Sequence, residues 1–419
     1  MAVNKTDIYV YADWIGLLQP TLVGVFSAHQ AQGRKAFSFV YDKEWLKRKE
    51  QRLIDPDIQF YPGQQFPNNK ENFGIFLDSM PDTWGRTLMK RREVQLAKVN
   101  EKKAKTLYDI DFLLGVYDET RMGAFRLKLD PDGDFLDNDT EKSTPPWSTV
   151  REFQQAVVHY ENDDENEAIN KWLKLLIAPG SSLGGARPKA NILDENNELW
   201  IAKFPSKNDT IDKAAWEFLT YKLAINAGVE MAECRMEKVN GQYHTFFTKR
   251  FDRVGTDRIH FSSAMTMTKN NEYTIKDNPA SYLDIVEFIQ DNGCRVDENL
   301  AQLWRRIAFY IAVSNTDDHL RNHGFILNDE GWQLSPAYDL NPSIDKDGLA
   351  LNIDMHNNAL DFELAKSVGE YFRLNDRQMD SIIAEVLTVV KDWEFLAKEI
   401  GISRAEQELM RSAFRAEIG

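Results

Sequence analysis

Residues 181–254 hold the pattern that most restricts the fold of this chain. A glycine-rich turn in "SSLGGARPKANIL" leads into a short apolar run, and "ELWIAKFP" predicts a second strand. The following "TIDKAAWEFLTYKLAINAGV" has apolar residues at helical spacing and Gly228 as a stop, and "YHTFFTKRFDR" predicts another strand. A glycine-rich turn followed by strand, strand, helix and strand is the plan of a small lobe that binds a nucleotide.

The rest of the chain predicts an α/β part before this region and a helical part after it. "DIYVYADWIG" and "KAFSFVYD" predict strands, and residues 82–105 and 148–176 predict helices. "NLAQLWRRIAFYIAVSN" and residues 376–400 have apolar stripes at helical spacing, and "SRAE" predicts a capping box that opens the last helix. The basic runs "KRR" and "EKKAK" in 82–105 read as a solvated helix face or, alternatively, as a docking surface for an acidic partner.

Residues 129–147 are rich in Asp, Pro and Gly and read as a linker. We therefore expect four segments: an N-terminal α/β subdomain at 1–130, a linker at 131–147, a nucleotide-binding small lobe at 148–254 and a helical catalytic lobe at 255–419. This arrangement predicts a bilobal fold, with a small α/β lobe and an α-helical lobe.

Composition narrows the class of protein. The 419 residues carry a net charge of −15, which argues against broad direct binding to nucleic acid or to an anionic membrane. Two cysteines far apart exclude a disulfide framework and a cysteine-based zinc site. The N-terminus lacks the pattern of a signal peptide, and no apolar stretch reaches the ~20 residues of a membrane helix. We expect a soluble, cytoplasmic protein.

The polar side chains are most concentrated in "NTDDHLRNHGF", residues 315–325. The predicted helix before it ends about Ser314, and "GFILNDEGWQLSPAYDL" after it predicts a hairpin with a turn at "NDEG" that leads to Asp339. Asp317, Asn322 five residues later and Asp339 match the order in which a kinase presents its catalytic aspartate and its magnesium ligands. The D-x-x-x-x-N spacing alone is weak and occurs by chance.

The predicted small lobe supplies the groups that phosphates need. Gly184 and Gly185 allow backbone N–H groups to approach phosphates, and Arg187 and Lys189 add positive charge. Lys203 lies in a short apolar strand, where it resembles the phosphate-pairing lysine of kinases. Glu217 on the next helix is a candidate partner for Lys203.

Each of these features also has a purely structural interpretation. The glycine pair is compatible with a simple hairpin turn, Lys203 with an exposed strand position, and Glu217 with a charge on a helix surface. The aspartates 317 and 318 could cap or follow a helix end, and Asp339 could form an Asx turn before "NPS". His319 and His323 lack the spacing of a zinc site, and we expect His319 to hold the loop through a hydrogen bond.

Taken together, "SSLGGARPKA", "IAKFP", "KRFDR", "NTDDHLRNHGF" and "LSPAYDL" resemble the HipA-type serine/threonine kinases, which are toxins of bacterial toxin–antitoxin pairs. The resemblance covers most of residues 175–345 and includes several motifs in order. It implies a small α/β lobe packed on an α-helical lobe, with ATP between them. It also implies a protein substrate such as a translation component, and a small DNA-binding antitoxin that neutralises the toxin, with DNA contacted only indirectly.

Carried over residue by residue, the resemblance makes Asp317 the catalytic base, Asn322 and Asp339 the Mg²⁺ ligands, and Lys203 the partner of the α/β-phosphates. The remaining ATP-binding positions that it implies are Ser182, Gly184, Gly185, Ala186, Lys249, Phe251 and His319. Ser182, or Ser181 beside it, falls where family members carry an autophosphorylated serine that shuts the ATP site.

The sequence departs from the family at two places. Lys249 stands where the family usually has an acidic residue, and "IHFSSAMTM" lacks the family's glutamine–acid stretch. Two other functions stay open on the sequence alone. One is a kinase of a small molecule or lipid, and the other is a non-catalytic pseudokinase module that binds ATP without turnover.

Overall fold

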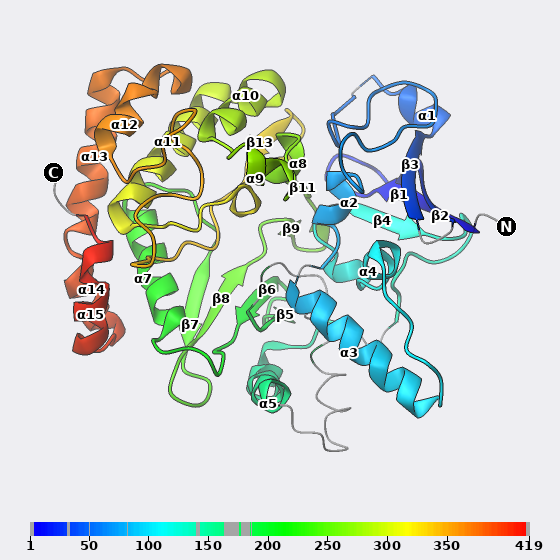
Figure 1. The fold of residues 1–419 in the computed structure, drawn as a ribbon, viewed down its shortest axis with the longest axis horizontal. Helices are drawn as coiled ribbons and strands as arrows, with labels where there is room; N and C mark the ends of the chain where they lie inside the picture. Colours follow the sequence, from blue (N-terminus) through cyan, green and yellow to red (C-terminus); the bar gives the residue numbers. More distant parts are fainter. Residues whose placement is uncertain are drawn as a thin grey trace. The chain divides into compact units, whose positions relative to one another are not determined.

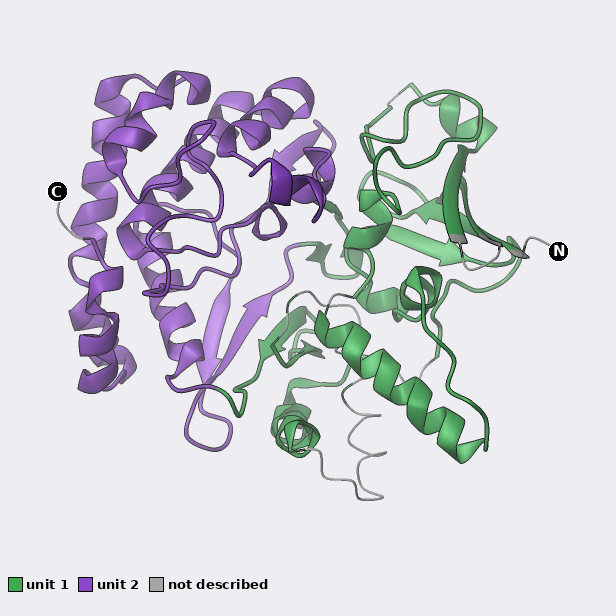
Figure 2. Cartoon of the chain, in the orientation of Figure 1, with its two compact units in different colours: residues 1–208, 252–262 green, residues 209–251, 263–419 purple. Residues whose placement is uncertain are grey.

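The structure is a computed structural model that describes residues 4–31, 34–49, 51–81, 83–139, 143–162, 176, 185 and 187–415. The chain forms two compact units, coloured separately in Figure 2. Unit 1 contains residues 1–208 and 252–262, and unit 2 contains residues 209–251 and 263–419. These units are defined by contacts within the chain, and the four segments expected from the sequence stay a prediction.

Unit 1 begins with a four-stranded antiparallel sheet in the order β3-β2-β1-β4 (Figure 1). Its strands are β1 (Asn4–Ala12), β2 (Thr21–Ala31), β3 (Arg34–Tyr41) and β4 (Phe125–Lys128). The helices of unit 1 are α1 (Lys43–Leu46), α2 (Gly74–Asp78), α3 (Thr83–Val99), α4 (Asp109–Leu114) and α5 (Val150–Glu161), with the short 3-10 helices η1 (Asp118–Thr120) and η3 (Trp147–Thr149).

Aromatic rings fill the core between this sheet and α2. Phe26 of β2 lies 5.4 Å from Phe37 and 4.1 Å from Phe76, measured between ring centroids, and all three side chains are buried. Full burial of one such ring contributes roughly 1.5–3 kcal/mol to folding. The predicted strands β1 and β3 are confirmed. β2 was not predicted, and its Gly24 has a packing reason, because a Cβ there would lie 2.3 Å from the carbonyl oxygen of Val40.

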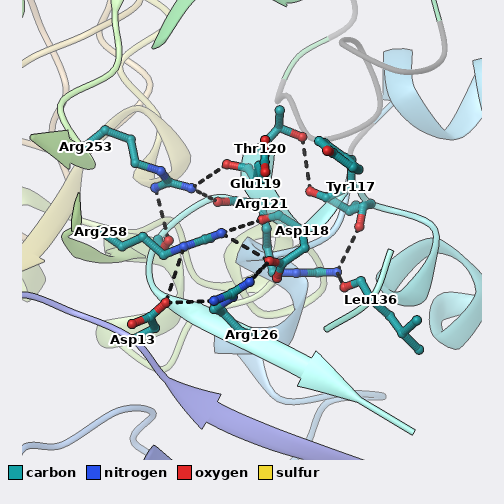
Figure 3. A network of polar contacts seen from close by, with 12 residues as sticks. Asp13, Tyr117, Asp118, Glu119, Thr120, Arg121, Arg126, Leu136, Arg253 and Arg258 are labelled. Atoms are coloured by element: carbon teal, nitrogen blue, oxygen red, sulfur yellow. Dashed lines mark hydrogen bonds and ion pairs between the residues drawn. The ribbon is translucent and has the colours of Figure 1, made fainter. Parts of the chain in front are cut away.

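A buried charge network, which we call the Asp118 network, holds the short hairpin β9 (Arg253–Val254) and β10 (Asp257–Arg258) in unit 1 (Figure 3). It consists of Asp13, Asp118, Arg121, Arg126, Arg253 and Arg258. Oδ2 of Asp118 accepts from Nε of Arg126 at 2.8 Å, and Arg258 Nη2 donates to the Asp118 carbonyl at 2.9 Å. Arg253 Nη2 donates to the Arg121 carbonyl at 2.7 Å. Charges from two distant parts of the sequence therefore compensate each other in the interior.

Arg121 is the most enclosed member of the Asp118 network. Its side chain is fully buried, and its guanidinium donates to the backbone carbonyls of Ser79, Leu113, Val116 and Leu136 at 2.9–3.4 Å. Burial lowers the pKa of Arg121 to about 10, so the group stays charged at neutral pH. Bonds to four carbonyls from its two Nη atoms partly compensate that buried cation and join α2, α4 and the 116–136 segment.

A second hairpin of unit 1 carries residues expected in the active site. It pairs β5 (Lys189–Leu193) with β6 (Leu199–Lys203) in antiparallel register, as the sequence predicted. Helix α3 begins beside it, since Trp84 Nε1 donates to the Lys189 carbonyl at 3.0 Å. The helix predicted at 82–105 is wrong at its end. α3 stops at Val99, and Glu101 adopts a left-handed φ of 52°, so the basic run 101–105 lies outside the helix.

Unit 2 is rich in helices. Its helices are α7 (Lys213–Asn226), α8 (Ala264–Met267), α9 (Thr274–Asp277), α10 (Tyr282–Asn292), α11 (Val296–Val313), α12 (Phe362–Ser367), α13 (Asp376–Val390), α14 (Trp393–Ile400) and α15 (Arg404–Met410). Its 3-10 helices are η4 (Leu320–Asn322), η5 (Gly369–Phe372) and η6 (Arg411–Ala413). Helix α11 is its central element and packs against α10, α12 and α13.

Two hairpins complete unit 2. They are β7 (Cys234–Glu237) with β8 (Thr245–Lys249), and β12 (Gly324–Leu327) with β13 (Trp332–Leu334). Strand β11 (His260–Ser263) contains the second of the two points at which the chain passes from unit 1 to unit 2. The turn predicted at "NDEG" is confirmed, with Gly331 N donating to Asn328 O at 3.2 Å.

Three helix predictions need correction. The helix predicted at 148–176 is described only as α5, and residues 163–175 lie outside the described residues. The helix predicted at 376–400 is two helices with a break at Lys391 and Asp392. The predicted capping box is half formed. Ser403 Oγ accepts from Glu406 N at 3.2 Å, but the Glu406 carboxylate accepts from Trp216 Nε1 of α7.

None of the helices in the described part of the chain is both long and apolar enough to cross a membrane.

Candidate active site

The loop after α11 is closed by bonds within itself. α11 ends at Val313, and its C-cap residue, Ser314, has a left-handed φ of 50° and turns the chain out of the helix. Nδ2 of Asn322 donates to the carbonyl of Asp317 at 2.6 Å, and N of Asn322 donates to the carbonyl of His319 at 2.7 Å. Because Nδ2 takes the donor role, the amide Oδ1 of Asn322 is the atom that could accept a cation.

The segment that carries Asp339 is held against this loop. Tyr338 Oη donates to the Arg321 carbonyl at 2.8 Å, and Asn341 N donates to Oδ1 of Asn315 at 3.1 Å. These bonds lie on either side of Asp339, which has a left-handed φ of 59°. The two candidate magnesium ligands expected from the sequence, Asn322 and Asp339, therefore come from segments that are bonded to each other.

Asp317 and Asp318 are neighbours in the chain but lie in opposite environments. Asp317 is exposed, whereas the side chain of Asp318 is fully buried. Burial raises the pKa of Asp318 to about 6. Only Asp317 can meet a substrate hydroxyl without a rearrangement of the loop, which agrees with the choice of Asp317 as the candidate base.

We expected the side chain of His319 to hold the loop through a hydrogen bond, and among the described residues it makes no such bond. Its ring Nδ1 is buried without a hydrogen-bond partner among the described residues, and the bond in the loop comes from its backbone carbonyl instead. His323 is fully buried between the rings of Tyr282 and Tyr310, at centroid distances of 5.5 and 6.0 Å. Burial lowers the pKa of His323 to about 3, so it is neutral at physiological pH.

The end of β8 carries the two residues expected to meet the adenine, Lys249 at its last position and Phe251 two residues later. Lys249 N donates to the Glu233 carbonyl at 2.8 Å, which fixes the backbone at the last residue of the strand. The ring of Phe251 lies 5.6 Å from the ring of Tyr338, the residue before Asp339. Unit 2 therefore carries Asp317, Asn322, Asp339 and Phe251 on segments that contact one another.

Unit 1 holds the expected phosphate-binding residues that are described. Lys203 ends β6 and is paired in register with Lys189 of β5. Gly185 has a φ of 86°, and a Cβ there would lie 2.5 Å from Nζ of Lys189. N of Trp84 donates to the Gly185 carbonyl at 3.2 Å. Lys189 is therefore packed directly against the glycine turn, and Trp84 of α3 holds that turn in place.

Four residues expected at the site lie outside the described residues: Ser181, Ser182, Gly184 and Ala186. Glu217 is buried on α7 of unit 2, and its pairing with Lys203 stays a prediction. No role was expected of Tyr338, although it lies within "LSPAYDL", or of Trp84, because their hydrogen bonds are made to other segments of the chain.

The oxygen donors of unit 2 suit Mg²⁺ better than a transition metal. Among the described residues, no group of three or more His, Cys, Asp and Glu side chains is placed to hold a metal ion. The carboxylate of Asp339 and the amide oxygen of Asn322 are both hard oxygen ligands. Magnesium in nucleotide sites is bound by one or two such protein oxygens together with phosphates.

Comparison with known proteins places this arrangement in a family. The model of the HipA-like C-terminal domain matches residues 181–393, which is just over half of the chain and includes every candidate residue named above except Trp84. The chain belongs to the HipA family.

One relative of this HipA-family chain matches less than half of its length. This relative is a Sinorhizobium fredii protein with the name "Putative kinase Y4mE", and it is 22% identical over 210 residues. That match covers 48% of this chain and 43% of Y4mE, so it spans less than half of the relative's length.

Solved structures show the fold. HipA of Shewanella oneidensis MR-1, solved with HipB and its operator DNA, superposes with a TM-score of 0.65 at 16% sequence identity, covering 97% of this chain and 94% of that chain. The HipA fold therefore extends over nearly the whole chain. The Helicobacter pylori proinflammatory kinase CtkA covers 54% of this chain and 90% of its own, with 13% identity and a TM-score of 0.38, which is too low to carry an argument.

Proposed function

We propose that this HipA-family chain is an ATP- and Mg²⁺-dependent kinase that phosphorylates serine or threonine hydroxyls of a cellular protein. The observation that carries the proposal is the assembly in unit 2. Asp317 is exposed in its loop, and the side-chain amide N–H of Asn322 donates to the Asp317 carbonyl. The segment that carries Asp339 is hydrogen-bonded to the same loop. The fold shared with HipA supports the proposal, as does the order of the motifs.

The proposal gives each candidate site residue of unit 2 a defined chemical task. Asp317 orients the attacking hydroxyl and accepts its proton as the oxygen–phosphorus bond forms. Asn322 Oδ1 and the Asp339 carboxylate hold Mg²⁺, and the Lys249–Phe251 segment meets the adenine. When bound, ATP supplies the γ-phosphoryl group and Mg²⁺ neutralises charge on the phosphate oxygens, with ADP as the leaving group.

Unit 1 contributes cations in this proposal. Lys203 pairs with the α/β-phosphates, and Lys189, beside Gly185, adds a second ammonium group for phosphate oxygens. Glu217 is proposed to hold Lys203 as an ion pair. Autophosphorylation of Ser182, or of Ser181 beside it, is proposed to inhibit the enzyme by placing a dianion in the glycine-rich turn.

The proposed biological role is that of a toxin neutralised by a small DNA-binding antitoxin. It rests on the fold shared with a HipA solved together with HipB and operator DNA. The net charge of −15 favours DNA contact that is mainly indirect, through the antitoxin. A translation component is the proposed class of protein substrate.

The test is phosphate transfer from γ-labelled ATP by the purified chain, with Mg²⁺ or with EDTA, and with mass spectrometry of the products. Label on a seryl or threonyl hydroxyl in the presence of Mg²⁺ only is the expected result. ATP binding without transfer to the chain or to a cell lysate would support the pseudokinase instead. Label found only on lipids or small molecules would support a kinase of that class.

A further inference from the structure

The buried neighbour of the candidate base is held by two groups from outside its loop. Oδ1 of Asp318 accepts from the backbone N–H of Ala350 at 2.6 Å, and Oδ2 accepts a short hydrogen bond from the hydroxyl of Tyr282. Both Asp318 and Tyr282 are fully buried. A carboxylate removed from water in this way is stable only while its hydrogen bonds are made.

The two partners of Asp318 come from two segments that are hydrogen-bonded to each other. Tyr282 N donates to the Asn352 carbonyl at 2.9 Å, and Asn352 N donates to the Ala280 carbonyl at 2.9 Å. Ser281, between them, caps α10 through its hydroxyl, which accepts from Leu283 N at 3.0 Å. The start of α10, which carries the Tyr282 hydroxyl, and the segment that carries the Ala350 N–H are therefore hydrogen-bonded to each other as well as to Asp318.

Several residues of the loop contact the segment that follows Asp339. Ser343 N donates to the Ser314 carbonyl at 3.0 Å, and Lys346 Nζ donates to the Thr316 carbonyl at 3.4 Å. Asp318 continues this series with its side chain. Asp317 lies between the second and third of these contacts, and its side chain is exposed.

We propose that Asp318 is a positioning residue of the reaction: its buried carboxylate, held by Tyr282 and Ala350, fixes the loop so that Asp317 faces the substrate hydroxyl. This inference rests on the proposed function. Asp318 itself touches neither ATP nor substrate and acts through Asp317.

The consequence is a rate effect without a binding effect. The two partners identified for Asp318, Tyr282 and Ala350, are not among the residues proposed to bind ATP. Misplacement of a catalytic group by about 1 Å costs on the order of 100-fold in rate. Loss of the Asp318 contacts should therefore lower kcat and leave the KM for ATP nearly unchanged.

The test compares the kcat and the KM for ATP of Tyr282→Phe, Asp318→Ala and Asp318→Asn with those of wild type, from rates measured over a range of ATP concentrations. Tyr282→Phe deletes one hydroxyl and keeps the ring that packs on His323. We expect kcat to fall about 10- to 100-fold in Tyr282→Phe and Asp318→Ala, with the KM for ATP changed less than about twofold. Asp318→Asn should retain most of the rate, because its amide can accept from Ala350 N–H and donate to the Tyr282 oxygen. Tyr371→Phe, at an exposed tyrosine of η5, is the matched control.

Hydrogen exchange of the peptide covering residues 315–323 is the second readout, since it does not depend on activity. Faster exchange there in Tyr282→Phe and Asp318→Ala, with the rest of unit 2 unchanged, is expected. Variants that remain folded and keep the wild-type kcat and loop exchange would overturn the inference while the kinase stands. A wild-type chain that transfers no phosphate overturns the proposed function and the catalytic role together, and the exchange data then report only on the loop.

Discussion

Lys189 and Lys203 lie directly opposite each other at one end of the β5–β6 hairpin. Cross-strand partners project from the same face of a hairpin with Cβ atoms about 5 Å apart, so two ammonium groups share that face. Gly185 with its left-handed backbone lies beside Lys189. An anion such as a phosphate group bound at this face would interact favourably with both ammonium groups.

Neutralising either lysine should weaken ATP binding. We expect Lys189→Met and Lys203→Met each to raise the Kd for ATP about 10-fold or more, because each removes a charge-assisted bond of roughly 1.5–3 kcal/mol. Titration calorimetry with ATP and Mg²⁺ measures the change, with Lys98→Met on the exposed face of α3 as the control. Wild-type affinity in both hairpin variants would show that this face does not meet phosphates.

The Asp118 network predicts that loss of a buried charge lowers the free energy of unfolding much more than loss of an exposed charge. Asp118→Ala should lower the free energy of unfolding by about 3–5 kcal/mol, because it leaves Arg126 and Arg258 without their shared carboxylate in the interior. Glu330→Gln, which breaks the exposed pair with Arg295, should leave stability unchanged within error. Chemical denaturation of the two variants measures the difference, and equal stabilities would contradict the structural role given to the network.

His260 predicts a loss of stability in acid. This residue is fully buried, and burial lowers its pKa from 6.5 to about 3. Between those values the unfolded chain takes up a proton that the folded chain does not, so stability falls as the pH drops below 6.5. At pH 5 this single group costs about 2 kcal/mol.

His260→Phe should remove that part of the pH dependence and keep a ring stacked on Trp14. The measured quantity is the change in the free energy of unfolding between pH 7.5 and pH 5, compared between variant and wild type. The comparison matters because burial raises the pKa of Asp55 in the same unit to about 6, which has the opposite effect on stability. An identical pH dependence in both proteins would mean that His260 does not titrate as the structure implies.

Local patterns predicted much of unit 2 correctly, for reasons visible in the structure. α11 buries a continuous apolar stripe, and the "NDEG" turn is made by Asn328 and Gly331, residues whose backbone preferences are strong. The order Asp317, Asn322, hairpin, Asp339 could be read because each residue follows a regular element. What the spacing could not tell is which of Asp317 and Asp318 is exposed, since that depends on Tyr282 and Ala350 from elsewhere in the chain.

Other differences arise where a local pattern continues through a structural break. Val390, Trp393 and Ala397 keep helical spacing across the boundary between α13 and α14, so the apolar stripe carried no sign of the break. Strand β2 was missed because Gly24 interrupts its apolar pattern, although that glycine is what allows β3 to approach. Glu406 was assigned to a cap that its carboxylate does not make, since Trp216 from α7 takes its oxygen.

The most direct test of the central claim compares phosphate transfer by wild type, Asp317→Asn and a control, Asp376→Asn, at the exposed start of α13. The three proteins would be assayed with saturating labelled ATP and Mg²⁺, with ATP affinity measured in parallel. We predict that Asp317→Asn loses transfer by a factor of about 100 or more and binds ATP as wild type does, while the control is unaffected. Transfer at the wild-type rate by Asp317→Asn would contradict the assignment of this loop as the catalytic centre.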